Sequence, residues 1–316
     1  MIKPHKIANV FMLFLLSFYL IQSIIISYLY WNLWENTAFG NFLSSPWYLM
    51  IGQITGLLGP LAIFKILEHK SPVFASEKYY KVPRLPLGLV NIFFVVAITF
   101  LIQPIVMLVA ALVSVFIPNP VPYMMMDIAV LPLPQALIVI AITPAICEEL
   151  VFREYIQSKY RMQPLFITAL INGLFFGILH MNIHQFTYAF IMGILFVYMV
   201  YITRSILSAI LAHFVLNATQ YTLGYMAIRH QGSITGGLPQ DEQIWENIMA
   251  LGIIAFLIMP LLGGVYYLFY QYNTKRKAAM GVGEVLPDLD NKPGNPFDLA
   301  FWAVVATFIF LLVLLR

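Results

Sequence analysis

Nine apolar stretches, each near the length that crosses a lipid bilayer, constrain this chain more than any other feature. A transmembrane helix needs about 20 predominantly apolar residues. Stretches of this kind cover residues 7–30, 46–67, 88–117, 134–160, 164–183, 185–202, 206–225, 248–271 and 297–315. Asp, Glu, Lys and Arg make up only 10% of the chain, whereas soluble domains carry about 25% charged residues. The sequence therefore predicts an all-α, polytopic transmembrane bundle of about nine spans, and it excludes a soluble enzyme, a nucleic-acid-binding protein and a disordered scaffold.

The basic residues are distributed unequally between the two sides of the predicted bundle. If the N-terminus is cytoplasmic and nine spans alternate, all but two of the 17 Lys and Arg residues lie on the inner side. The two exceptions are Arg229 and Arg316. Because Lys and Arg concentrate in cytoplasmic loops, we predict a cytoplasmic N-terminus. We also expect the protein to lie in the plasma membrane of a prokaryote. The segment 275–296, basic and then rich in Gly and Pro, is predicted to be a cytoplasmic linker.

Ionisable residues that lie deep in the predicted spans are confined to the middle third of the chain. Such residues are costly in a bilayer and commonly mark functional sites. With a rise of about 1.5 Å per residue, four polar residues fall within about 12 Å of one another in membrane depth. These residues, which come from three predicted helices, are Glu148, His180, His213 and Asn217. We therefore expect their side chains to meet in one buried site.

The two adjacent glutamates are expected to have different roles, because neighbouring residues on a helix point about 100° apart. Glu149 and Arg153 are four residues apart, so they share a helix face and are predicted to form a supporting ion pair. Glu148 then points elsewhere and is available as a general base. Pro144 lies one turn before Glu148. It is predicted to kink the helix and to leave a backbone carbonyl free near residue 140.

Two further helices are predicted to complete the site. His213 and Asn217 are four residues apart, so an imidazole and an amide project side by side from one helix. Both groups can donate a hydrogen bond to a developing oxyanion. Phe176 precedes His180 by four residues and is predicted to form a wall beside that imidazole.

These residues form three short motifs in a fixed order. The chain contains EExxxR at Glu148–Arg153, FxxxH at Phe176–His180 and HxxxN at His213–Asn217. In this order the motifs resemble those of the CAAX-protease and bacteriocin-processing family of intramembrane endopeptidases, also called the CPBP or ABI family. The resemblance covers roughly residues 134–225. We accordingly predict N-terminal transmembrane helices (1–130), a catalytic core of four helices (131–228) and C-terminal transmembrane helices with the cytoplasmic linker (229–316).

The resemblance implies an activity, namely hydrolysis of a peptide bond in a membrane-associated or lipid-modified protein or peptide. It implies that Glu148 and His180 activate the attacking water, and that His213 and Asn217 stabilise the oxyanion. Members are commonly classed as metalloendopeptidases, although a metal-free glutamate mechanism is also argued for the family. We favour a mechanism without a cofactor because it gives all four residues a role. The alternative is a zinc site made by Glu148, His180 and His213.

Two other classes of function are compatible with the residues alone. A catalytically silent bacteriocin-immunity protein or regulatory membrane scaffold would keep the fold for partner binding, with Glu149 and Arg153 as a structural staple. A proton-coupled transporter would use Glu148 and Glu149 as a relay, but the sequence has no internal repeat of the kind common in transporters. The GxGD and GxSxG motifs of other protease classes do not occur in the sequence.

Overall fold

The computed structural model of the chain describes residues 3–70, 84–231, 241–282 and 294–314, and every regular element within these ranges is helical. The α-helices are α1 Pro4–Leu29, α2 Ala38–Leu43, α3 Pro46–Gln53, α4 Gly59–Lys70, α5 Leu89–Ser114, α6 Val121–Ile128, α7 Leu133–Leu137, α8 Thr143–Glu149, α9 Gln157–Lys159, α10 Leu165–Leu179, α11 Ile183–Thr203, α12 Ile206–Gln231, α13 Asp241–Ala279 and α14 Leu299–Leu314. Residues 283–293 of the predicted cytoplasmic linker lie outside the described ranges.

Within the described residues, seven helical segments are long and apolar enough to cross a membrane, and each coincides with a predicted span. The two remaining predicted spans correspond to the shorter apolar helices Leu165–Leu179 and Leu299–Val313. A helix of 15 residues such as α10 is about 22 Å long, which is less than the thickness of about 30 Å of the hydrocarbon core. The structure therefore confirms an all-α, polytopic integral membrane protein, and the count of nine spans stays a prediction.

The fourth candidate span, Leu133–Lys159, is the most deeply buried of the seven and is not a uniform α-helix. Two π-helical turns, at Ile138–Ile142 and Leu150–Ile156, join α7, α8 and α9. A π-turn adds one residue to a helical turn, so it changes the direction of the side chains that follow, and such turns are frequent at functional sites. Here the two π-turns stand on either side of the α8 segment that carries the paired glutamates.

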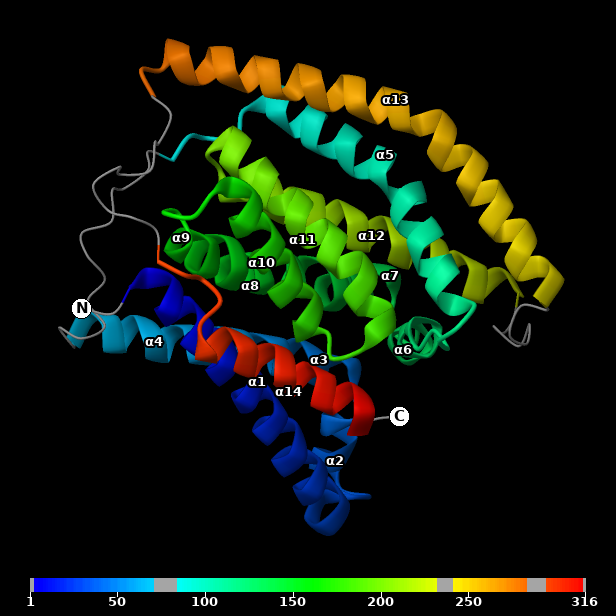
Figure 1. Cartoon of the computed structure of the whole chain (residues 1–316). Coiled ribbons are helices and arrows are strands. Elements are labelled where there is room, and N and C mark those ends of the chain that lie inside the picture. The colour runs from blue at the N-terminus through cyan, green and yellow to red at the C-terminus, as the bar shows by residue number, and fades with distance from the viewer. Residues whose placement is uncertain (1–2, 71–83, 232–240, 283–293, 315–316) are drawn as a thin grey trace.

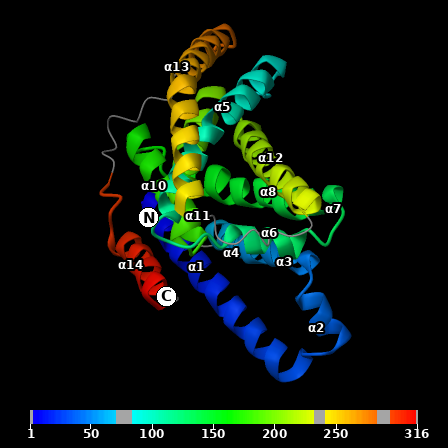
Figure 2. The same cartoon turned by 90° about the vertical axis from the view of Figure 1, so that its right-hand side faces the viewer.

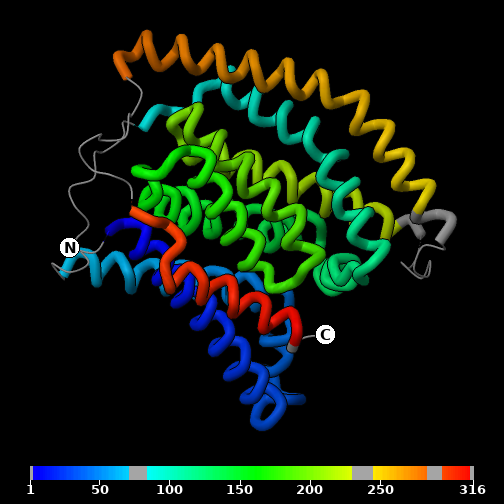
Figure 3. Tube along the Cα trace, viewed as in Figure 1, coloured from blue at the N-terminus to red at the C-terminus, as the bar shows by residue number. Residues whose placement is uncertain are grey.

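The helices α8, α10, α11 and α12 form the centre of the molecule (Figure 1). The helices α5 and α13 pack against each other on one side of this centre, and α1 and α4 lie on the other side (Figures 1 and 2). The trace in Figure 3 shows that α10, α11 and α12 run in alternating directions, as short connections between successive helices require. The central helices are therefore the ones whose side chains are most shielded by protein.

The helices α10 and α11 approach each other closely because glycines lie in their contact. A Cβ atom on Gly173 would stand 2.8 Å from the carbonyl oxygen of Phe190, and one on Gly193 would stand 2.7 Å from the Cα atom of Gly173. Any larger residue would force the helices apart, which is why small residues favour close helix packing in membranes. The close packing brings the rings of Phe176 and Phe196 to a centroid distance of 6.3 Å.

Candidate active site

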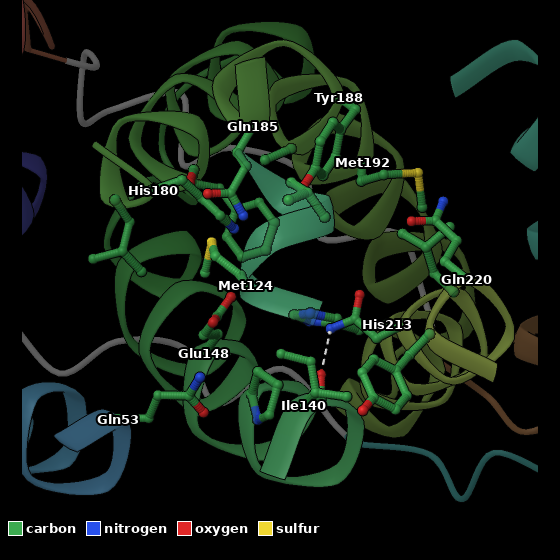
Figure 4. Close-up of a pocket in the computed structure, with 18 of the residues that line it drawn as sticks. Gln53, Met124, Ile140, Glu148, His180, Gln185, Tyr188, Met192, His213 and Gln220 are labelled. Carbon is green, nitrogen blue, oxygen red and sulfur yellow. Dashed lines mark hydrogen bonds between the residues drawn. The ribbon is translucent and has the colours of Figure 1, made fainter. Parts of the chain in front are cut away.

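A cavity of about 290 Å³ lies where α8, α10, α11 and α12 meet. All four residues predicted to form a site line this cavity, namely Glu148, His180, His213 and Asn217. Figure 4 shows the labelled side chains of Glu148, His180 and His213 around one space. The structure thus brings together the four residues that were predicted to meet because they lie at a similar membrane depth.

Glu148 presents a buried carboxylate to this cavity. The residue is only 9% exposed, and its Oε2 atom has no hydrogen-bond partner among the described residues. A buried polar atom without a partner is costly, and the cost is removed when a water or substrate group binds in the cavity. Glu148 is therefore placed to accept a proton from a molecule that enters the site.

Glu149 faces away from this cavity and is fully buried in a network of its own. Its Oε2 atom lies 3.0 Å from Nε of Arg153, which confirms the predicted ion pair. Its Oε1 atom accepts a hydrogen bond from Nδ1 of His213 at 2.9 Å. The second contact joins residues 64 positions apart, and no local pattern in the sequence indicates it. Glu149 therefore orients a predicted site residue in addition to neutralising Arg153.

The guanidinium of Arg153 is enclosed by aromatic rings. Its Cζ atom lies 4.9 Å from the ring centroid of Phe176, 5.3 Å from that of Phe196 and 5.7 Å from that of Phe152. A cation over an aromatic face is attracted by the ring quadrupole, most strongly where water is excluded. The side chain is 0% exposed, so the ion pair with Glu149 and the three rings together hold the buried charge.

Phe176 separates the two imidazoles and meets both of them edge to face. Its ring centroid lies 5.4 Å from that of His180 and 5.7 Å from that of His213, at interplanar angles of 75° and 86°. Nδ1 of His180 lies 2.9 Å from the carbonyl oxygen of Phe176. Because a carbonyl can only accept, Nδ1 of His180 carries a proton, and in the neutral imidazole Nε2 is the acceptor. The predicted wall beside His180 is confirmed, and it also supports His213.

Pro144 in the fourth span leaves a partner for Asn217, whereas the predicted kink at this proline stays a prediction. Pro144 has no N–H group, and the Nδ2 amide of Asn217 donates a hydrogen bond to the carbonyl oxygen of Ile140 at 3.1 Å (dashed line in Figure 4). This carbonyl is the one that the proline was predicted to leave available. The hydrogen bond fixes the amide in the cavity wall and leaves its second N–H group for a ligand.

Several residues of the cavity wall come from helices outside the predicted core. They include Tyr19 of α1, Gln53 of α3 and Met124 of α6. The Oε1 atom of Gln53 is buried and has no hydrogen-bond partner among the described residues, and Figure 4 places its side chain beside Glu148. The division of the chain at residues 131–228 stays a prediction, but the cavity as a structural unit extends beyond that range. Uncharged residues in separate spans carry no signal that would have identified them.

The predicted alternative, a zinc site, would need Glu148, His180 and His213 to converge on one point. Among the described residues, no three His, Cys, Asp or Glu side chains are grouped closely enough to hold a metal ion. Nδ1 of His180 and Nδ1 of His213 are engaged by Phe176 and Glu149. Glu148, His180 and His213 therefore share a cavity, but within the described residues they are not grouped as a ligand cluster.

Comparison with known proteins gives one match, and it covers the segment that forms the site. Residues 130–219 match the family model described as type II CAAX prenyl endopeptidase, Rce1-like. The match contains all three motifs and confirms the resemblance to the CAAX-protease family. No curated protein matched the chain. No solved structure matched it.

Proposed function

We propose that this protein is a CAAX-type intramembrane endopeptidase that hydrolyses a peptide bond of a membrane-associated or lipid-modified protein or peptide. The observation that carries this proposal is the buried, unpartnered carboxylate of Glu148 in one cavity with His180, His213 and Asn217. The match of residues 130–219 to an endopeptidase family supports the same reaction class.

Water activation is assigned to Glu148 and His180. Nε2 of His180 is the acceptor nitrogen of its neutral imidazole, because Nδ1–H donates to the carbonyl of Phe176. A water held between this nitrogen and the carboxylate of Glu148 is polarised on both of its hydrogens. Glu148 takes one proton as the water oxygen attacks the scissile carbonyl, and it returns that proton to the leaving amine. The products are a carboxylic acid and an amine, and Glu148 is regenerated.

Oxyanion stabilisation is assigned to His213 and Asn217. Nδ1–H of His213 is committed to Glu149, so its Nε2 can donate only when the imidazole carries both protons. Asn217 adds its second amide N–H. Two donors that point at the developing negative charge lower the barrier because they need no reorganisation during the reaction.

The contacts of Glu149 argue against a proton-coupled transporter. Its two carboxylate oxygens contact Arg153 and His213, so a proton relay through it would require breaking a fully buried network. A catalytically silent scaffold and an endopeptidase can be distinguished by experiment. The endopeptidase needs the carboxylate of Glu148 for its activity, whereas the scaffold does not.

The test is cleavage of peptides by purified protein in detergent or proteoliposomes. Farnesylated peptides that end in a CAAX sequence are compared with the same peptides without the prenyl group and with unrelated membrane peptides. Glu148→Gln is expected to reduce kcat by about 10²–10⁴, the usual contribution of a general base, while the protein stays folded. Glu246→Gln is the matched control, because Glu246 is exposed on α13 and does not line the cavity. Equal cleavage by wild type and Glu148→Gln would refute the proposal.

A further inference from the structure

The second candidate span contributes one polar side chain to the candidate active-site cavity. Within the segment Pro46–Lys70, Gln53 and Leu57 line this cavity. The Oε1 atom of Gln53 is buried and has no hydrogen-bond partner among the described residues. An unpaired polar atom in such surroundings is costly, and a donor that enters the cavity can pair with it.

The fold holds Gln53 next to the segment that carries Glu148. Gln53 is the last residue of α3 and directly precedes a π-turn, Ile54–Leu58. Both α3 and this π-turn contact α8, and π-turns are frequent at functional sites. Figure 4 shows the side chains of Gln53 and Glu148 on one side of the space and that of His213 on the other. The second span therefore places an amide beside the carboxylate of the fourth.

The proposed hydrolysis, on which this inference rests, requires one more hydrogen-bonding group in the cavity. In a trans peptide the N–H and C=O bonds point in opposite directions. If His213 and Asn217 receive the oxygen of the scissile carbonyl, the N–H of the same peptide group points away from them. A buried N–H without a partner is costly, so an acceptor is needed across the cavity from these two residues.

Gln53 is the side-chain amide of the wall that meets this requirement. Glu148 and His180 hold the water in the proposed reaction. Oε1 of Gln185 accepts a hydrogen bond from the N-cap residue of α11, and Gln220 lies on α12, the helix that carries the oxyanion donors. Oε1 of Gln53 is unpartnered among the described residues and lies on the side of Glu148.

We propose that Gln53 binds the N–H group of the scissile peptide bond through its Oε1 atom. Attack of water on the carbonyl carbon converts the planar nitrogen into an amine-like nitrogen with a lone pair. Because Gln53 holds the N–H, this lone pair faces Glu148. The proton that Glu148 took from the water passes to the nitrogen, and the C–N bond breaks. The amine leaves with its original hydrogen and the new one, and Gln53 neither gains nor loses a proton.

The experiment compares a peptide bond with an ester bond at the same position of one substrate. An ester oxygen in place of the scissile nitrogen removes the N–H group. Gln53→Met keeps the length of the side chain and removes the amide. It is expected to lower kcat/KM for the peptide about tenfold, as loss of one hydrogen bond does, and to change kcat/KM for the ester by less than about twofold. An equal loss on both substrates, or no loss on the peptide, would overturn the assigned role.

Gln22→Met is the matched control for this substitution. Gln22 of α1 contacts the same π-turn, because its Nε2 atom lies 3.4 Å from Oγ1 of Thr55, and its Oε1 atom is also buried without a partner among the described residues. It does not line the cavity. The control should change kcat/KM for the peptide by less than about twofold. A tenfold loss in the control would assign the effect to packing around the π-turn and contradict the role of Gln53.

Stability and a second variant separate binding from misfolding. The melting temperature of Gln53→Met is expected to equal or exceed that of the wild type, because an amide oxygen without a partner contributes no hydrogen bond to the fold. Gln53→Asn withdraws the amide by one methylene group and should show the same selective loss on the peptide. A lower melting temperature together with equal losses on peptide and ester would make Gln53 a structural residue only.

The outcomes also separate this role from the proposed function. Peptide cleavage that is lost in Glu148→Gln but unchanged in Gln53→Met and Gln53→Asn would overturn the role of Gln53 alone. No cleavage of any peptide by the wild type would overturn the proposed function, and the role of Gln53 with it.

Discussion

The molecule has a second cavity, of about 210 Å³, and the two cavities lie at opposite ends of the same central helices and differ in chemistry. The candidate active-site cavity is lined by one carboxylate, two imidazoles and four side-chain amides, together with apolar side chains. The second cavity, called here the arginine cavity, is lined by four arginines and one glutamate. The difference shows how position along a membrane helix selects residue types. Arg84, Arg161 and Arg204 lie in connections between helices, where headgroups and water are within reach. Arg153 is instead buried within the fourth span, where the carboxylate of Glu149 neutralises it.

The ion pair between Glu149 and Arg153 lies between the two cavities. Arg153 lines the arginine cavity, whereas Glu149 holds His213 of the candidate active-site cavity. The ion pair therefore connects a residue of the second cavity with a residue that holds the wall of the first. Because the pair touches both regions, substitutions there are expected to have larger effects on folding than substitutions in either cavity.

The largest effect on stability is expected for Glu149→Gln. The change leaves the buried guanidinium of Arg153 without a countercharge and removes the carboxylate that holds His213. Removal of one partner of a buried pair costs about 3–5 kcal/mol. Thermal melting of the purified protein in detergent measures the loss. Glu154→Gln at the rim of the arginine cavity, where the exposed pair with Arg84 is broken, should cost at most about 1 kcal/mol. Similar melting temperatures for the two variants would contradict the assigned difference between the pairs.

A smaller effect, confined to catalysis, is expected for Asn217→Ala. The substitution removes one oxyanion donor and the hydrogen bond to the Ile140 carbonyl, so kcat should fall by about 10²–10³. Peptide cleavage at saturating substrate measures this. Thr219→Val is the matched control, because Thr219 lies on the same helix, bonds only to the backbone of Val215 and does not line the cavity. The control should change kcat by less than about twofold. Full activity of Asn217→Ala would remove Asn217 from the mechanism.

The smallest effect is expected from metal removal. If Glu148 acts as the base and not as a ligand, treatment with a chelator should change kcat by less than about twofold, and purified active protein should contain less than stoichiometric zinc. Metal analysis and activity are measured on the same preparation. Stoichiometric zinc, together with activity that is lost to the chelator and restored by zinc, would replace the proposed roles with the alternative ligand set of Glu148, His180 and His213.

The helices and the pair Glu149–Arg153 were predictable from the sequence because both depend on local patterns. Runs of apolar residues define candidate spans in a medium where every backbone group must be bonded internally. Residues four apart share a helix face wherever that helix lies, and the carbonyl of Ile140 follows from Pro144 in the same way. The length of α10 was not predictable in this way, because a run of apolar residues does not show where the helix ends.

The sequence by itself determined that this chain is a helical membrane protein and which polar residues lie at a common depth, because hydropathy and helical rise act along one dimension. Only the tertiary structure decided which face of each helix meets which neighbour. Several contacts join segments that are far apart in the chain. They are the hydrogen bond between Glu149 and His213, the aromatic rings around Arg153, the position of Gln53 in the cavity wall and the four arginines of the second cavity. Such contacts depend on how closely two helices approach, which small residues such as Gly173 determine. The approach depends on the surfaces of both helices, so it cannot be read from the sequence of one helix alone.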